Sequence, residues 1–137
     1  MKEGFTVVKE VILSSDYQSL IEVESLVSAV CEDFGVQTDA FGNVLIAVSE
    51  AVNNAIQHGN KENKDASVYI QVSTDPTHFC IQVKDEGLGF SYQDLPDPTA
   101  PENLLKDSGR GVFLMQNLAD EVEFIHAGNT VNLYFHK

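Results

Sequence analysis

Three short polar clusters carry the residue types that could do chemistry in this chain: residues 50–60, 85–90 and 108–111. The first offers a carboxylate and an amide one helical turn apart, and the second an Asp followed by a glycine turn. The third places two glycines at the start of an expected helix. Each pattern is common by itself, but together and in this order they predict a pocket for a nucleotide and its metal ion.

The first cluster places Glu50 and Asn54 about 40° apart on a helical wheel, pointing away from Val48 and Val52. Mg²⁺ prefers hard oxygen ligands and is usually completed by water and phosphates, so the Asn54 amide is a candidate ligand. A carboxylate one turn away could accept the proton of an attacking hydroxyl or water, which makes Glu50 a candidate general base. The alternative is an ordinary solvated helix face.

The second cluster begins with Asp85, which ends a strand of alternating apolar residues and precedes Gly87, Gly89 and Phe90. An ionised carboxylate only accepts hydrogen bonds, so Asp85 could accept one from an exocyclic amine such as that of adenine. Glycines at alternate positions let the backbone approach a flat ring and adopt positive φ. The alternative is a common strand-ending turn.

The third cluster, Ser108-Gly109-Arg110-Gly111, precedes an expected helix with Ser108 as its N-cap. Free N–H groups and the helix dipole can bind phosphate there, and the guanidinium fork of Arg110, the only arginine in the chain, suits phosphate oxygens. A plain cap and a surface arginine are the alternatives. His58, at the edge of an apolar helix stripe, is interpreted as a packed residue that helps to end its helix.

The elements that must position these clusters follow from hydrophobic periodicity and from stop signals. Ser15 and Gln18 are expected to form a capping box, and Gly35 to end the helix that follows. Thr38 or Asp39 should cap the next helix. The expected order is strand 5–13, helix to 34, helix to about 58, hairpin 68–72 and 79–83, loop 91–108, helix, and hairpin 121–126 and 130–136. This order predicts an α+β class, a two-layer α/β sandwich with a mostly antiparallel sheet and three helices on one face.

Composition limits the partners that this chain can have. The 137 residues suit one domain, and 21 Asp and Glu against 8 Lys and Arg give a formal charge of −13. Such a surface repels phosphate backbones and anionic lipid, so we expect no direct nucleic-acid or membrane binding. Cys31 and Cys80 are expected to be buried free thiols, and no signal peptide is expected, which predicts a cytoplasmic protein.

The three clusters resemble the sequence boxes of one ATPase superfamily, shared by gyrase, the ninety-kilodalton heat-shock chaperone, sensor histidine kinases and mismatch-repair proteins. E-x-x-x-N at residues 50–54, followed by His-Gly at 58–59, resembles its N box. D-x-G-x-G at 85–89 resembles the first glycine box, G-x-G at 109–111 the second, and Thr130 the threonine near the adenine-binding Asp.

The short length and the continuation Gly111-x-x-x-Met115 most resemble the bacterial anti-sigma factor serine/threonine kinases. The resemblance implies a Bergerat-type ATPase fold, ATP and Mg²⁺ as cofactors, and residues 91–108 as a lid. Asn54 would hold Mg²⁺ and Glu50 would be the general base. The residues at the ATP site would be Asn54, His58, Asp85, Gly87, Gly89, Phe90, Ser108, Gly109, Arg110, Gly111 and Thr130.

Kinases of this kind bind and silence a sigma factor, phosphorylate a serine on a small anti-anti-sigma antagonist, and tend to form homodimers. Members often carry an arginine just before the second glycine box, whereas Arg110 lies inside it; Arg110 or Lys106 is the candidate replacement. That departure keeps open an alternative, a non-catalytic ATP- or ADP-binding module that sequesters a protein partner. A detached ATPase half of a histidine kinase is a third interpretation.

Overall fold

The computed structural model describes residues 2–60, 63, 65–87, 107–125 and 129–137, and for residues 58 and 107–110 it describes the backbone alone. Within these ranges, none of the helices combines the length and the apolar character that crossing a membrane requires.

The described chain contains one sheet and three α-helices. The strands are β1 (Thr6–Ser14), β2 (Ser67–Thr74), β3 (His78–Lys84), β4 (Glu121–Ile125) and β5 (Thr130–His136). The helices are α1 (Ser19–Asp33), α2 (Thr38–Asn54) and α3 (Asp107–Leu118), and a π-helical turn, η1 (Ala55–Gly59), continues α2. The sheet order is β1-β2-β3-β5-β4, and all four pairings are antiparallel. The predicted α+β class and element order are confirmed.

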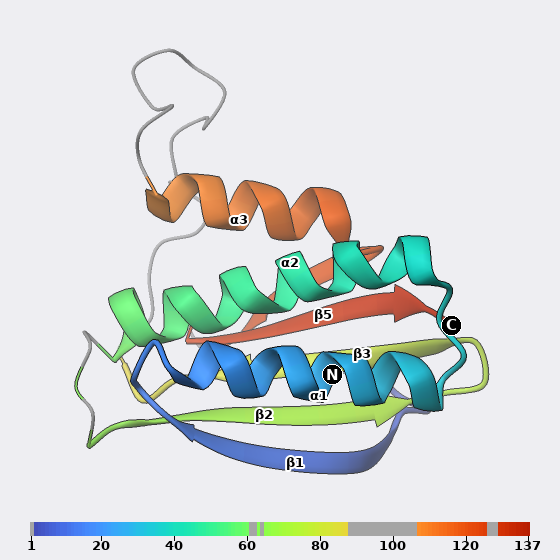
Figure 1. Cartoon of the computed structure of the whole chain (residues 1–137), viewed down its shortest axis with the longest axis horizontal. Coiled ribbons are helices and arrows are strands. Elements are labelled where there is room, and N and C mark those ends of the chain that lie inside the picture. The colour runs from blue at the N-terminus through green and yellow to red at the C-terminus, as the bar shows by residue number, and fades with distance from the viewer. Residues whose placement is uncertain (1, 61–62, 64, 88–106, 126–128) are drawn as a thin grey trace.

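The helices form a second layer on one face of the sheet (Figure 1). Helix α2 packs between α1 and α3 and also contacts β3 and β5. The predicted apolar stripe of α2 is fully buried, and so are the alternating residues of β2 and β3; these residues are Val44, Val48, Ala51, Val52, Ala55, Val68, Ile70, Val72, Phe79, Ile81 and Val83. Because α2 is the central helix, residues of both neighbouring helices can contact its side chains.

Three helix starts differ from the sequence prediction. Helix α1 begins at Ser19 after Gln18, which makes no side-chain cap hydrogen bond, and Ser15 instead donates its hydroxyl to the Ala66 carbonyl at 2.9 Å. The capping box is therefore wrong, because a partner distant in sequence competes for that hydroxyl. Helix α2 begins at Thr38 itself, after Gln37. Helix α3 begins at Asp107, so residue 108 lies inside the first turn and is not the cap.

Gly35, by contrast, has φ +68°, which is the left-handed conformation predicted for a glycine that ends a helix. Helix α1 ends two residues earlier, at Asp33. The stop signal is confirmed because it depends on backbone sterics alone.

Both cysteines are buried free thiols, as predicted. Burial raises the pKa of Cys31, and it raises the pKa of Cys80 to about 12. Both groups are therefore protonated thiols, which are poor nucleophiles and poor metal ligands.

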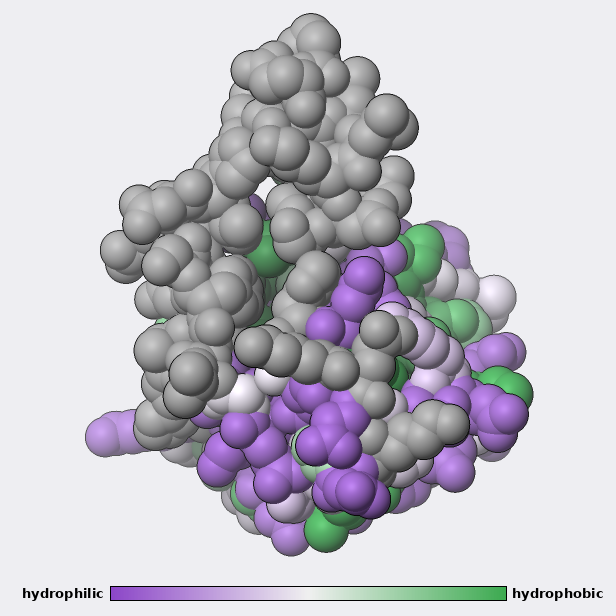
Figure 2. Space-filling view, turned by 90° about the vertical axis from the view of Figure 1, so that its left-hand side faces the viewer, coloured by the Kyte–Doolittle hydropathy of each residue, from purple (hydrophilic) through white to green (hydrophobic). Residues whose placement is uncertain are grey.

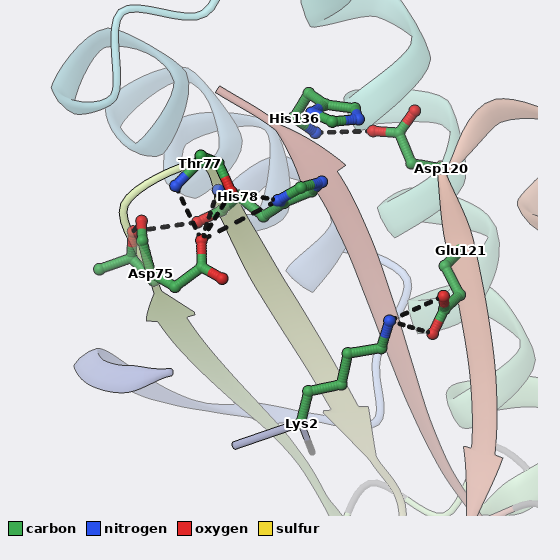
Figure 3. A network of polar contacts seen from close by, with 8 residues as sticks. Lys2, Asp75, Thr77, His78, Asp120, Glu121 and His136 are labelled. Carbon is green, nitrogen blue, oxygen red and sulfur yellow. Dashed lines mark hydrogen bonds and ion pairs between the residues drawn. The ribbon is translucent and has the colours of Figure 1, made fainter. Parts of the chain in front are cut away.

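The end of the sheet that carries the β2–β3 turn is closed by local polar contacts (Figure 3). The Asp75 carboxylate accepts hydrogen bonds from the backbone N–H of Thr77 at 2.9 Å and of His78 at 2.6 Å. Lys2 and Glu121 form an ion pair of 2.8 Å nearby. The described residues of the three polar clusters lie at the opposite end, where α2 and β3 end and β5 begins.

Candidate functional site

Helix α2 places Glu50 and Asn54 on its polar side, as the helical wheel predicts. Both side chains are partly exposed, whereas Val48 and Val52 on the opposite side are completely buried. No hydrogen bond to another described residue engages the Glu50 carboxylate or the Asn54 amide.

The start of α3 lies directly against these two side chains. A Cβ atom on Gly111 would lie 3.0 Å from Asn54 Nδ2 and 3.1 Å from Glu50 Oε2. Helix α3 can approach α2 this closely because residue 111 has no side chain. The third cluster thus meets the first, although the two are distant in sequence.

The second cluster meets the other end of the same helix. A Cβ atom on Gly59, the last residue of η1, would overlap the Asp85 carboxylate, and one on Gly87 would overlap the Gly59 carbonyl. Asn54 and Gly59 are separated by roughly 7 Å along a helix axis. The Asp85 carboxylate therefore lies against the end of the helix that carries the Asn54 amide, and a π-helical turn, a common feature of functional sites, separates Asn54 from that end.

Asp85 is 7% exposed and is held by backbone groups. Its N–H donates to the Asn129 carbonyl at 2.9 Å, and its Oδ1 accepts from the Gly87 N–H at 2.7 Å. Burial raises the pKa of Asp85, and the Gly87 hydrogen bond partly offsets that rise. Oδ2 accepts no hydrogen bond from another described residue, and a donor such as an exocyclic amine is the kind of group that it can bind.

The structure specifies the packing of Gly87 and the hydrogen bonding of Thr130 in this region. Among the described glycines only Gly4 and Gly35 have positive φ, so the predicted positive φ of Gly87 is wrong. Glycine is needed there for its small size, because the Gly59 carbonyl occupies the space of a side chain. Thr130 is completely buried opposite Lys84, and its hydroxyl donates to the Asn129 amide oxygen at 3.2 Å rather than to the neighbouring carboxylate.

Several expected site residues are described in part or not at all. Gly89, Phe90, Lys106 and residues 91–105 of the expected lid lie outside the described residues. Residues 107–108 of that expected loop belong to α3 instead. His58 lies in η1 and Ser108, Gly109 and Arg110 in the first turn of α3, each described by its backbone alone.

The sequence interpretation missed two asparagines. Asn129 accepts the Asp85 N–H through its carbonyl, and its side chain donates to the Gly87 carbonyl at 3.4 Å. Asn60 is buried and accepts the Glu86 N–H at 2.8 Å. The only local signal was an Asn beside a glycine, which predicts a turn or a helix end and says nothing about the distant segment that it contacts.

The donor set suits a cation that is shared with a ligand. Among the described residues no group of three or more His, Cys, Asp and Glu side chains could enclose a metal ion. The Asn54 amide oxygen would be a protein ligand of a Mg²⁺ ion whose remaining ligands are mainly phosphates and water. Hydrophilic side chains make up most of the described surface at this end (Figure 2), which fits a charged ligand.

Comparison with known proteins agrees with this geometry. The profile of the histidine kinase-like ATPase domain matches residues 13–135. Serine-protein kinase RsbW from the Staphylococcus aureus strains JH9, Newman and JH1 is 33% identical over 142 aligned positions, which cover 96% of this chain and 86% of the relative. The chain therefore belongs to the histidine kinase-like ATPase domain family and, within it, to the serine-protein kinases related to RsbW.

Proposed function

We propose that this protein is an ATP-dependent serine/threonine protein kinase of the anti-sigma type. The observation that carries the proposal is the contact of both glycine-bearing segments with one helix. Gly111 lies against Glu50 and Asn54, and Asp85 lies against the end of the same helix at Gly59. This spacing along one helix suits a ligand with a flat base at one end and a triphosphate at the other.

Each residue then has a defined task. The Asp85 carboxylate accepts a hydrogen bond from the adenine amine, and Thr130 supports it through Asn129. Backbone N–H groups in the first turn of α3 bind phosphate oxygens, with Arg110 as the candidate cation. Bound Mg²⁺ would neutralise phosphate charge, and Asn54 would hold it. Glu50, about one turn from Asn54, accepts the proton of the attacking serine hydroxyl.

The proposed partners are a sigma factor, which the protein binds, and an anti-anti-sigma antagonist, which it phosphorylates on serine. The identity to a serine-protein kinase supports the choice of a hydroxyl acceptor. A sigma-factor partner would place the activity in the cytoplasm, and the two free buried cysteines are consistent with that compartment.

The decisive experiment is incubation of the protein with γ-labelled ATP, Mg²⁺ and candidate antagonists encoded beside its gene. Labelled phosphoserine on the antagonist, absent when Mg²⁺ is chelated, is the expected result. A protein that binds ATP and its partner but leaves no label on any antagonist would contradict the kinase proposal.

One observation favours a second candidate, a non-catalytic nucleotide-binding module that sequesters its partner. Arg110 lies within the first turn of α3, inside the second glycine box, and not just before it. Phosphoryl transfer depends on accurately placed positive charge, so a displaced arginine could leave binding intact and stop transfer. The same labelling experiment separates the two candidates.

A further inference from the structure

Asn60, the residue directly after η1, forms a buried hydrogen-bonding centre. It is 6% exposed, and its Nδ2 donates to Ser15 Oγ at 2.7 Å and to the Ser67 carbonyl at 2.9 Å. Its Oδ1 accepts the Glu86 N–H at 2.8 Å. Both donors and the acceptor of this one amide are therefore used, and they reach three separate chain segments.

The backbone of Asn60 fixes the amide relative to α2. Its N–H donates to the Ala55 carbonyl at 2.8 Å, which closes the π-helical turn. Ordinary termination of a helix requires nothing more than such a backbone bond or a local cap. The additional contacts with the β1–α1 junction, the start of β2 and the turn after β3 thus exceed what ending the helix demands.

The contact with Glu86 is the one that bears on the site, because Glu86 lies between Asp85 and Gly87. The N–H of Asp85 is held from the β5 side by Asn129, and the next N–H is held from the α2 side by Asn60. These two anchors on consecutive peptide groups determine where the Asp85 carboxylate points. Asn60 provides the anchor that ties the carboxylate to the helix bearing Glu50 and Asn54.

We propose that Asn60 is a positioning residue for base recognition, holding the Asp85–Gly87 turn so that the carboxylate faces the exocyclic amine of adenine. The inference rests on the proposed binding of ATP. It predicts that Asn60 determines the preference for a 6-amino over a 6-oxo purine, because a displaced carboxylate no longer distinguishes a donor from an acceptor at that position.

The test compares ATP with inosine triphosphate, which carries an oxygen in place of the amine, by calorimetry at a temperature where every variant is folded by circular dichroism. Wild type should prefer ATP by roughly 10-fold or more, the effect of one charge-assisted hydrogen bond. Asn60→Ala should bring the preference close to one. Ser15→Ala is the matched control, because it removes a different arm of the same centre; it should lower Tm and keep the preference.

The outcomes separate the two proposals. A wild-type protein that binds neither nucleotide overturns the proposed function and this inference with it. Wild-type preference for ATP that is retained in Asn60→Ala overturns the role of Asn60 alone.

Asn60→Ala in an Asp85→Asn background should cause no further change in preference, and an additional change would contradict action through Asp85. If Asn60→Ala does not fold, Asn60→Ser, whose hydroxyl is one bond shorter than the amide, replaces it with the same expected loss.

Discussion

The two ends of the site differ in how firmly their functional groups are held. At the base end, Asp85 is buried, its flanking N–H groups are bound by Asn129 and Asn60, and its carboxylate lies against Gly59. At the phosphate end, Glu50 and Asn54 are partly exposed and make no side-chain hydrogen bond with another described residue. Across the helix interface they face the Gly111 backbone.

In the proposed nucleotide site, the groups assigned to recognition are therefore held more firmly than the groups assigned to chemistry. A buried acceptor whose flanking backbone groups are held is preorganised, so binding a base there would require little rearrangement. Glu50 and Asn54 are the groups proposed for catalysis, and no hydrogen bond from another described residue holds their side chains. Changes at the two ends should therefore affect different measurable quantities.

The largest expected effect is at the phosphate end. Glu50→Ala should lower the rate of phosphoryl transfer by about 10²- to 10⁴-fold, the usual contribution of a general base, and should leave ATP affinity nearly unchanged. Single-turnover labelling and calorimetry measure the two quantities separately. Glu22→Ala, which removes an exposed carboxylate from α1, is the control. An undiminished transfer rate in Glu50→Ala would exclude Glu50 as the base.

The opposite separation is expected at the base end. Asp85→Asn should weaken ATP binding by roughly 10- to 100-fold, because a charge-assisted hydrogen bond to the adenine amine is lost. At saturating ATP the transfer rate should change much less than the affinity. Equal ATP affinity in wild type and variant, measured by calorimetry, would contradict the adenine role of Asp85.

A substitution that replaces neither Asp85 nor Glu50 can test the tight packing at the base end. Gly59→Ala should displace the Asp85 carboxylate, weaken ATP binding and cost about 1–3 kcal/mol of stability, as overpacking usually does. Gly42→Ala, also in the helix but with nothing within 4 Å of its new methyl group, is the matched control. It should stabilise the protein by about 0.5–1 kcal/mol through helix propensity. Similar stability changes in both variants would contradict the packing argument.

Stability should depend on pH through Asp85 in a defined direction. Burial raises the folded-state pKa of Asp85, so the folded protein resists its ionisation, and wild type loses stability as pH rises from about 4 through that folded pKa. Asp85→Asn never ionises. Its Tm should therefore match that of wild type below about pH 4 and exceed it at neutral pH. Thermal unfolding measured across this range checks the sign, which a Tm difference that grows toward low pH would contradict.

The smallest effect concerns association with the proposed sigma factor, which neither end of the pocket determines. The formal charge of −13 should accelerate encounter with a basic surface. Stopped-flow association rates should fall on the order of 10-fold between about 50 mM and about 500 mM salt. The Glu22→Ala control, which removes one exposed carboxylate, should bind ATP with nearly the affinity of wild type. Association rates independent of salt would contradict electrostatic recruitment.

Much of the fold was predictable because its signals are local. The alternation in β2 and β3, the stripe on α2 and the stop at Gly35 depend on side-chain period and backbone sterics, and all agree with the structure. The predicted capping box at Ser15 failed because the competing partner is distant in sequence. Ser15 has the residue type of a cap, but Ala66 lies beside it only after β2 has paired with β1.

Residue types and local spacing are enough to name the chemical groups of the candidate site: a carboxylate and an amide one turn apart, a carboxylate at the end of a strand, and glycines where backbone must come close. Tertiary structure alone decided how they meet. The π-helical turn brings Gly59 onto Asp85, Gly111 allows α3 to approach Asn54, and Asn60 ties the turn after β3 to the central helix. In these contacts, atoms from a distant segment lie close to a glycine or to a buried amide. The periodicity of the local sequence does not specify which distant segment that will be.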